Sequence, residues 1–396
     1  MLKSDFTVGI EEEYFLVDAE SFATAGVTAD AMFKDADAAT KGAVKREFLQ
    51  SQVEVITRPH ASIAAARDEL IDLRLELARI AGERGIAIMA AGTHPTALWN
   101  EETLSPGWRY EAVMDSLQMI GRRNMLCGTH VHVELPDPDR RYDVMTRMLP
   151  YLPLLLALST SSPFWQRHRT GLKGYRLAAY DELPRTGMPE LLRTKAEFDD
   201  YVTQLSAAGA IPDSSHLWWA IRPSLRYPTL ELRALDSCTR LQDTIALAAL
   251  YRTMARHLYF NPNHLAGIGA IERAIAIENQ WLAKRHGTAA CFVSSTGRKT
   301  VTESLDEVIE LMAADAEALG CLDEVLDCRR IVDRGSSADR QLAIYDAHSE
   351  ADGDAAFTAV AAWLVATTTG SALSSHDRDA VRTVSPSAAD IGVAAD

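Results

Sequence analysis

The sequence predicts an α+β fold in which a mainly antiparallel sheet is followed by helices. Segments with a strand pattern concentrate before residue 236, whereas 241–316 and 354–369 are almost wholly helical in pattern. Strands and helices therefore do not alternate as they do in parallel α/β folds. The strand segments carry one polar face each, which is typical of antiparallel sheets with one face open.

Apolar periodicity and turn residues predict the individual elements. Strands are expected at 6–17, 47–57, 86–91, 126–135 and 229–235. Ser62 should cap a helix whose apolar residues recur at helical spacing until Gly85. Further helices are predicted around 108–121 and, interrupted by prolines, over 140–161. The stretch 162–190 is rich in Gly, Pro and Arg and is expected to be a long functional loop.

The domain organisation is expected to be simple. A chain of 396 residues could form one large domain or two ordinary ones. No stretch resembles a linker between independent domains, and no internal repeat is present. We therefore expect a single domain over residues 1–373. The segment 374–396 is small and polar and is expected to be a disordered tail.

Composition and charge exclude several classes of function. The chain is 47% hydrophobic and 24% charged, as folded globular proteins are. Its formal net charge of −15 argues against nucleic-acid binding. The beginning of the chain has no signal-peptide core, and the apolar run 149–158 is too short to span a membrane. Five scattered cysteines without a CxxC pair argue against disulfides or structural zinc and favour a cytoplasmic protein. A homo-oligomer is compatible with the sequence.

The first strand carries three consecutive glutamates. Residues two apart on a strand share a face, so Glu11 and Glu13 should point the same way. Two carboxylates roughly 7 Å apart repel each other unless a cation or a base lies between them. Glu12 should point to the opposite, apolar face, where only an arginine partner that the sequence does not identify would account for it.

Two later strands repeat this arrangement of polar side chains on one face. His130, His132 and Glu134 share a face of the strand 126–135, and Glu231 and Arg233 share a face of the strand 229–235. Arginine next to a carboxylate could neutralise charge that develops during phosphoryl transfer.

A further acidic pair lies in the segment 47–57. Glu47 and Glu54 are seven residues apart, and this odd separation would place them on opposite faces of a regular strand. If both face one site, a loop or bulge must lie between them. Carboxylates from several strands, with few histidines, suit Mg²⁺ or Mn²⁺ better than zinc.

Each pattern also has a reading without function. The paired glutamates could be a solvated strand face, the histidines a hydrogen-bonded core face, and the Glu–Arg pair a surface ion pair. Their joint occurrence on several strands favours a site. The sequence has no GxxxxGK[ST], no GxGxxG after a strand and no GxSxG nucleophile elbow. ATP would therefore bind without a P-loop.

The ordered set of motifs resembles a known family. The motifs are GIEEEYFLVD, REFLQSQVEVIT, AGTHP, CGTHVHVEL, SSPFWQ, RTGLKGYR, IRPSLRYPTLELRALD and ENQWLAKRHG. Together they resemble bacterial carboxylate–amine ligases of the glutamate–cysteine ligase type 2 family, from about residue 5 to about residue 370. The resemblance implies a glutamine synthetase-like core whose curved sheet forms a funnel, with ATP at one end and amino acids at the other.

The resemblance also implies a reaction and its cations. ATP phosphorylates a carboxylate, expected to be the γ-carboxylate of glutamate, and an amine such as that of cysteine displaces the phosphate. The cations should be Mg²⁺, with Mn²⁺ as an alternative. The expected ligand sets are, for one cation, Glu13 with Glu47 and Glu54 and, for the other, Glu11 with His130 and Glu231.

Arginines complete the site that the resemblance implies. Arg233 should bind ATP and neutralise the transferred phosphoryl group, and Arg176 and Arg222 are expected to bind substrate carboxylates. His132 should only line the same face. Where the family pattern has an aspartate after two tryptophans, this chain has Ala220, which puts cysteine as the acceptor in doubt. The segment 335–341 also matches the family, without an assignable role.

Two other functions remain open at this level. A phosphotransferase of the guanidino-kinase type also phosphorylates small molecules on an antiparallel sheet. A non-catalytic binding protein could have kept the same scaffold. Accumulation of a phosphorylated product without an amide would indicate the kinase, and the complete acidic set argues against the binding protein.

Overall fold

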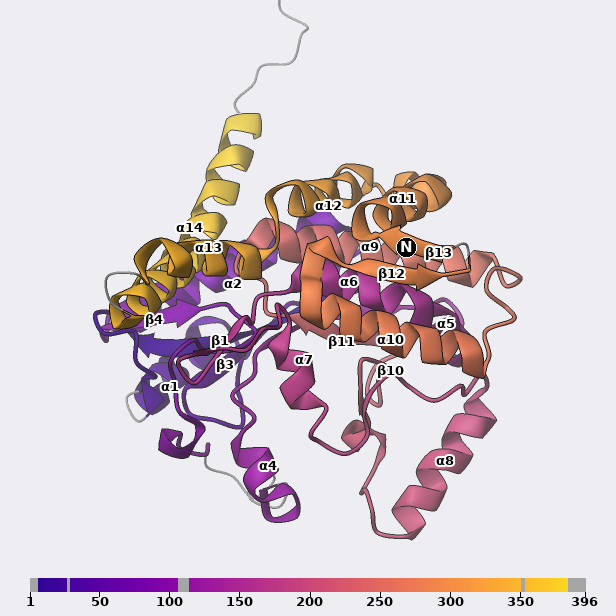
Figure 1. The fold of residues 1–396 in the computed structure, drawn as a ribbon, viewed down its shortest axis with the longest axis horizontal. Coiled ribbons are helices and arrows are strands. Elements are labelled where there is room, and N and C mark those ends of the chain that lie inside the picture. Colours follow the sequence, from indigo (N-terminus) through magenta and orange to yellow (C-terminus); the bar gives the residue numbers. More distant parts are fainter. Residues whose placement is uncertain (1–5, 27–28, 106–113, 296, 350–352, 384–396) are drawn as a thin grey trace, which may run out of the picture.

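A seven-stranded antiparallel sheet forms the centre of the molecule (Figure 1). The computed structural model describes residues 6–26, 29–105, 114–295, 297–349 and 353–383. The strand order is β10-β11-β5-β1-β3-β2, with β4 pairing to the end of β1, and the sheet does not close into a barrel. The strands are β1 (Val8–Asp18), β2 (Val44–Arg46), β3 (Gln52–Ile56), β4 (Ile86–Met89), β5 (Gly128–Glu134), β10 (Ile221–Pro223) and β11 (Thr229–Asp236). The predicted α+β class with an antiparallel sheet is confirmed.

Strand β1 organises this sheet because it pairs with three neighbours. Its first half pairs with β5, its middle with β3 and its last residues with β4. Its apolar side chains Val8, Ile10 and Tyr14 are fully buried, on the same face as Glu12. The side chains of alternate residues therefore lie on the opposite face of the sheet.

Helices cover the apolar face of the sheet in a second layer. Helix α2 (Ile63–Gly82) contacts β1, and α9 (Leu241–Phe260) contacts both β1 and β5. Most side chains of α9 are buried, including its uninterrupted apolar run 245–251. Figure 1 shows α2, α9, α12 and α14 together along the upper side of the sheet in that view. The other main helices are α1 (Ala29–Ala39), α8 (Lys195–Ala207), α10 (Ala270–His286), α11 (Val301–Ala318), α12 (Leu322–Arg334), α13 (Ser337–His348) and α14 (Gly353–Thr383).

Several predicted elements agree with the structure. Ser62 caps α2, its hydroxyl accepting a hydrogen bond from the Ala65 amide at 3.2 Å. The proline-interrupted segment forms α5 (Arg141–Met148) and α6 (Leu152–Ser159), separated by a 3₁₀ turn. Of the helix predicted around 108–121, residues 108–113 lie outside the described residues, and α4 is Met119–Arg122.

Three predictions about local structure were wrong. Of the strand expected over 47–57, only 52–56 form a strand, β3, whereas 47–51 form a loop that follows β2. The stretch 162–190 is not one loop. It contains β6 (Phe164–Trp165), β7 (His168–Arg169), α7 (Tyr175–Tyr180) and β8 (Thr186–Gly187), the last pairing with β9 (Trp218–Trp219). The helical stretch 241–316 also contains a hairpin of β12 (Cys291–Ser294) and β13 (Gly297–Thr300).

The C-terminal helix bears on the predicted domain boundary. Helix α14 continues past Ser374 to Thr383, and residues 384–396 lie outside the described residues. The single domain over 1–373 and its tail remain predictions. Within the described part of the chain, no helix is both long and apolar enough to cross a membrane.

A buried ion pair joins the sheet to the helices behind it. Glu12 and Arg74 are both fully buried, and the carboxylate receives two hydrogen bonds from the guanidinium at 2.6 and 2.8 Å. The hydroxyls of Tyr14 and Thr244 also donate to Glu12. Arg74 donates in addition to the carbonyl of Cys238 at 2.9 Å. The arginine partner that Glu12 requires is therefore present, and it lies on α2.

Glu12 attaches β1 to two helices, α2 and α9. Arg74 belongs to α2, and Thr244 belongs to α9. A buried carboxylate with every oxygen hydrogen-bonded is tolerated, whereas one that loses its partner is strongly destabilising. Glu12 fixes β1 against the helices, so that Glu11 and Glu13 must face away from them.

Replacing Arg74 with methionine should destabilise the fold strongly. The variant leaves Glu12 buried without a cation, and we expect a loss of about 3–5 kcal/mol. Urea unfolding followed by tryptophan fluorescence would measure it. Arg79→Met on the same helix is the control, because Arg79 is 54% exposed and pairs at the surface, where the expected loss is below about 1 kcal/mol. Equal losses in the two variants would contradict the role given to Arg74.

Candidate active site

Three groups of acidic and histidine side chains lie on the face of the sheet opposite the helices. In each group, one possible ligand atom per residue lies within 4.8 Å of the others. The groups are Glu13, Glu47 and Glu54; Glu11, Glu54 and His130; and Glu11, His132 and Glu231. Glu11 and Glu54 each belong to two of them, so the three groups form one continuous site.

The first group follows from the pairing of β1 with β3. Glu13 lies directly opposite Glu54 in the antiparallel register. Glu47 comes immediately after β2, in the loop 47–51, and this loop lets it face the same site as Glu54. The expected interruption between the two glutamates is therefore present, and the structure brings together the three residues that the resemblance assigned to one cation.

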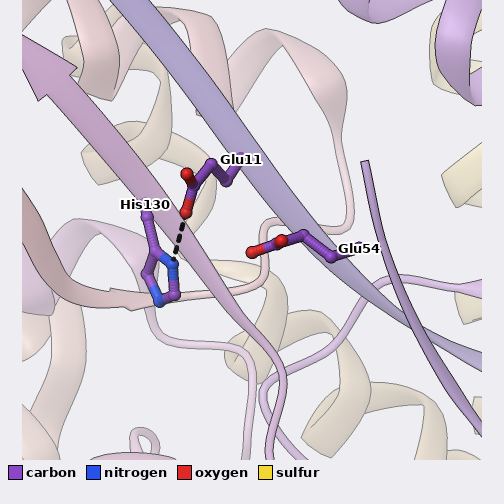
Figure 2. A group of neighbouring side chains, drawn as sticks. All are labelled: Glu11, Glu54 and His130. Atoms are coloured by element: carbon purple, nitrogen blue, oxygen red, sulfur yellow. Dashed lines mark hydrogen bonds and ion pairs between the residues drawn. The ribbon is translucent and has the colours of Figure 1, made fainter. Parts of the chain in front are cut away.

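The second and third groups centre on Glu11. Glu11 lies opposite His130, whose Nδ1 is 3.1 Å from the carboxylate. Figure 2 shows this contact and the carboxylate of Glu54 directed toward it from the neighbouring strand. His132 Nε2 lies 3.2 Å from the other oxygen of Glu11, and His132 is directly opposite Glu231 on β11.

The grouping differs in one respect from the predicted ligand set. The sequence analysis placed His130 with Glu11 and Glu231 and left His132 as a residue that lines the face. In the structure, His132 is the histidine that groups with Glu11 and Glu231, and His130 groups with Glu11 and Glu54. The sequence could have indicated His132 as a ligand, because it shares a strand face with His130. Metal binding by any of these residues remains a proposal.

The electrostatics of the first group favour a bound cation. Enclosure by the protein, together with the neighbouring carboxylates, raises the pKa of Glu47 to about 8 and that of Glu54 well above its usual range. Three carboxylates this close cannot all stay ionised without compensating positive charge. An oxygen-rich set of this kind fits Mg²⁺ or Mn²⁺.

The third group is compensated by the protein itself. Burial alone would raise the pKa of Glu11, but hydrogen bonds from His130 and His132 outweigh it and hold that pKa well below its usual range. Burial would also raise the pKa of Glu231, but Arg222 and Arg233 keep it far below its usual range. These two carboxylates are therefore ionised whether or not a cation is bound.

Two arginines hold Glu231 from different sides. Arg222 binds it through Nε at 2.9 Å and Nη2 at 3.1 Å, while its Nη1 donates to the carbonyls of Ser215 and Leu217. Arg233 Nη1 donates to the same carboxylate at 2.5 Å. The Arg222 guanidinium is thus occupied by protein groups, which favours a role in positioning Glu231. Substrate binding by Arg222 is untested.

Arg233 keeps part of its hydrogen-bonding capacity free. Its Nη2 lies 3.3 Å from the hydroxyl of Tyr180, and its buried Nε has no hydrogen-bond partner among the described residues. The Arg233 side chain is only 13% exposed. A buried cation with a donor left over is suited to an anion that is present only during the reaction.

Arg176 is buried beside β5 and β11. Its Nη1 donates to the carbonyls of Arg233 and Leu235, and it lies so close to Gly128 that a Cβ there would be 2.2 Å from Nη2. The Gly128 amide also donates to the carboxylate of Glu13. Gly128 therefore serves the site twice, through its backbone donor and through its missing side chain.

A pocket opens beside these groups. Its charged lining residues are Glu13, Glu47, Arg176 and Arg233. Most of its other lining residues are apolar, namely Phe48, Met114, Leu117, Leu126, Leu183 and Trp218. A small molecule bound here would have its charged end at the carboxylates and arginines.

The segment Gly335–Gln341, which had no assigned role, supports Arg176 from behind. Gln341 donates to the carbonyl of Ser161 at 2.8 Å. The Ser161 amide and the Ser162 hydroxyl then donate to Asp236, and Ser162 Oγ accepts from the Arg176 amide. The segment therefore holds Ser161 and Ser162 in place, and Ser162 in turn binds the backbone of Arg176 in the first turn of α7.

Comparison with known proteins identifies the family of this chain. Residues 7–359 match the family described as glutamate-cysteine ligase family 2. Two relatives, both named "Putative glutamate--cysteine ligase 2", come from Bradyrhizobium sp. strain ORS 278 and Rhodospirillum rubrum. The first is 53% identical over 365 residues, covering 92% of this chain and 88% of the relative. The second is 43% identical over 378 residues, covering 93% and 97%.

Solved structures share the fold at low sequence identity. The glutamate–cysteine ligase of Francisella tularensis, in complex with AMP, superposes with a TM-score of 0.66 at 16% identity, covering 97% of this chain and 96% of that one. The bifunctional glutathione synthetase of Pasteurella multocida gives a TM-score of 0.70 at 15% identity, covering 93% of this chain and 53% of that one.

Fold, site and relatives define an ATP-dependent carbon–nitrogen ligase. Within that class, the chain belongs to glutamate-cysteine ligase family 2.

Gly128→Ala should disable the site. The added methyl group would displace the Arg176 guanidinium, which is buried and held by two carbonyls. We expect ligase activity to fall by at least about tenfold, with a loss of stability of about 1–3 kcal/mol. The matched control is Gly9→Ala on the neighbouring strand, where a Cβ would make only an ordinary contact with His132 at 3.9 Å. Comparable activity in both variants would show that the position of Arg176 is unimportant.

Proposed function

We propose that this ligase activates the γ-carboxylate of glutamate by phosphorylation with ATP and then transfers the acyl group to an amine. The observation that carries the proposal is the continuous site of carboxylates and histidines beside Arg233, in the absence of a nucleophile motif. The names of the relatives support glutamate as the donor. Membership of the family favours a ligase over the kinase and over the binding protein.

Mg²⁺ or Mn²⁺ would be held by the residues of the three groups. Glu13, Glu47 and Glu54 offer a set of carboxylates alone, and Glu11 joins the histidines and Glu231. When bound, such cations would supply positive charge that offsets the charge of the transferred group. The raised pKa values of Glu47 and Glu54 reflect burial and the negative charge of neighbouring carboxylates, which a bound cation would offset.

Arg233 is placed to act on the phosphoryl group itself. Glu231 fixes its guanidinium through Nη1, and Arg222 fixes Glu231 in turn. The fixed guanidinium, whose buried Nε has no partner among the described residues, would then stabilise a phosphoryl group that reaches the site. Because the guanidinium is largely enclosed, its interaction with an anion is stronger than it would be in water.

The metal-binding proposal is tested with Glu11→Gln and Glu231→Gln. Both variants should fold but lose turnover, and Mg²⁺ with a nucleotide should no longer raise the melting temperature. Thermal shift with and without Mg²⁺–ADP measures this effect independently of activity. Glu134→Gln on β5 is the control, since Glu134 lies outside the three groups and accepts a hydrogen bond from Thr7. Near-normal turnover in the Glu11 and Glu231 variants would refute the site.

Replacing Arg233 with lysine keeps the charge but loses the planar set of donors. We expect kcat to fall by roughly a hundredfold or more, while the affinity for ATP changes much less, because the interaction is strongest in the transition state. Steady-state kinetics separate the two effects. A variant altered only in its KM for ATP would identify Arg233 as a group that binds the ground state.

The route through an acyl phosphate is tested by isotope transfer. With no protein nucleophile, the carboxylate oxygen must attack the γ-phosphorus of ATP directly. Glutamate labelled with ¹⁸O in its γ-carboxylate should therefore transfer one labelled oxygen to the released phosphate, as detected by mass spectrometry. Label in AMP, with pyrophosphate as the other product, would indicate an acyl adenylate and overturn the mechanism.

A further inference from the structure

The pocket beside the site has two chemically different walls. Glu13, Glu47, Arg176 and Arg233 form the charged wall, at the place where phosphoryl transfer is proposed. The apolar lining residues, here called the apolar wall, include Met114, Leu117, Leu126, Leu183 and Trp218. Asn124 and Tyr180 add polar groups to the same lining. A ligand that fills the pocket therefore meets both charged and apolar side chains.

The apolar wall is built into the fold. Its residues come from four separate segments: the turn after α7, the residues before β5, the segment 114–117 and strand β9. Met114, Leu126 and Leu183 are at most 8% exposed. Trp218 is held by the pairing of β9 with β8 and by the Arg185 guanidinium, 5.4 Å from its ring. Because four separate segments of the chain contribute these largely buried side chains, the apolar wall is a preformed binding surface.

The same segment links this wall to the reacting groups. Leu183 lies in the turn that closes α7, where its amide donates to the carbonyl of Tyr180 at 3.0 Å. The hydroxyl of Tyr180 in turn accepts from Arg233. Tyr180 therefore links Leu183 to Arg233 through two hydrogen bonds, so a group in contact with Leu183 lies near the Arg233 guanidinium.

The chemistry of the apolar wall excludes the glutamate donor from it. The part of glutamate remote from its γ-carboxylate carries both an ammonium and a carboxylate. Placing these charges against leucine and tryptophan side chains would remove them from water without partners, which is costly. Cysteine, as the acceptor, would leave most of the apolar wall uncovered. A larger apolar group would cover it and be stabilised by the surface removed from water.

We propose that the pocket binds an acceptor amino acid with a bulky apolar side chain, in preference to cysteine. This inference rests on the proposed ligase function and names the acceptor class. The amine nitrogen faces the charged wall, with Arg176 near the acceptor carboxylate and the side chain against Leu183 and Trp218. The nitrogen attacks the acyl carbon, forming the C–N bond. The C–O bond to phosphate breaks, phosphate leaves with the electron pair, and the nitrogen loses its proton to solvent.

A comparison of acceptors tests this proposal. With ATP, Mg²⁺ and glutamate fixed, kcat/KM is measured for leucine, phenylalanine, cysteine and serine by mass of the conjugate. We expect leucine or phenylalanine to exceed cysteine by at least about tenfold. Leu183→Ser should lower kcat/KM for the apolar acceptor by about 10- to 100-fold and that for cysteine by less than about threefold. Leu311→Ser, on the exposed face of α11, is the control.

A second variant and a binding measurement keep the test decisive. Leu117→Ser changes a partly exposed residue of the same wall and should repeat the effect if Leu183→Ser fails to fold. Calorimetric titration of leucine and of serine into the enzyme with Mg²⁺–ADP should show tighter binding of leucine. Preference for cysteine or serine, or a change confined to the KM for ATP, would overturn the acceptor assignment. Absence of phosphate release with every acceptor, while leucine still binds more tightly, would instead refute the proposed function alone.

Discussion

The buried pair of Glu12 and Arg74 is the interaction on which the arrangement of the site depends. Strand β1 carries three glutamates in succession, and a strand must turn the middle one to the face opposite its neighbours. On that face Glu12 meets Arg74 from α2 and Thr244 from α9, and both glutamate oxygens are hydrogen-bonded. The cost of burying the middle carboxylate is thereby offset. Its two neighbours are fixed on the open face, at the centre of the sheet.

The open face then gathers like charges that the protein compensates unevenly. Around Glu231 the compensation comes from two arginines, and around Glu11 it comes from two histidines. Around Glu47 and Glu54 the described residues supply too little positive charge, and the pKa values of these carboxylates rise. The protein therefore compensates the charge around Glu11 and Glu231 by itself, whereas the charge around Glu47 and Glu54 would be balanced by a bound cation.

Much of this site could be predicted because strand periodicity is a local property. The shared faces of Glu11 with Glu13 and of Glu231 with Arg233 follow from a spacing of two residues. Partners that come from distant segments could not be found in this way. Arg74 lies on a helix with no motif of its own, and the fit of Arg176 against Gly128 depends on tertiary packing. The hairpin of β12 and β13 was missed because its strands have only four residues each, between two long helices.

Shared residues tie the three ligand groups to one another. Glu54 belongs to the group of Glu13 and also to that of His130, and Glu11 belongs to the groups of both histidines. An ion that binds Glu54 in one group would therefore change the position of this carboxylate in the other group. Filling of such a site is a collective property, in which each ion alters the affinity for the following one. If the proposed cations bind, occupancy of one group would alter the affinity of the next, so a magnesium titration of the ligase would depart from the curve expected for independent sites.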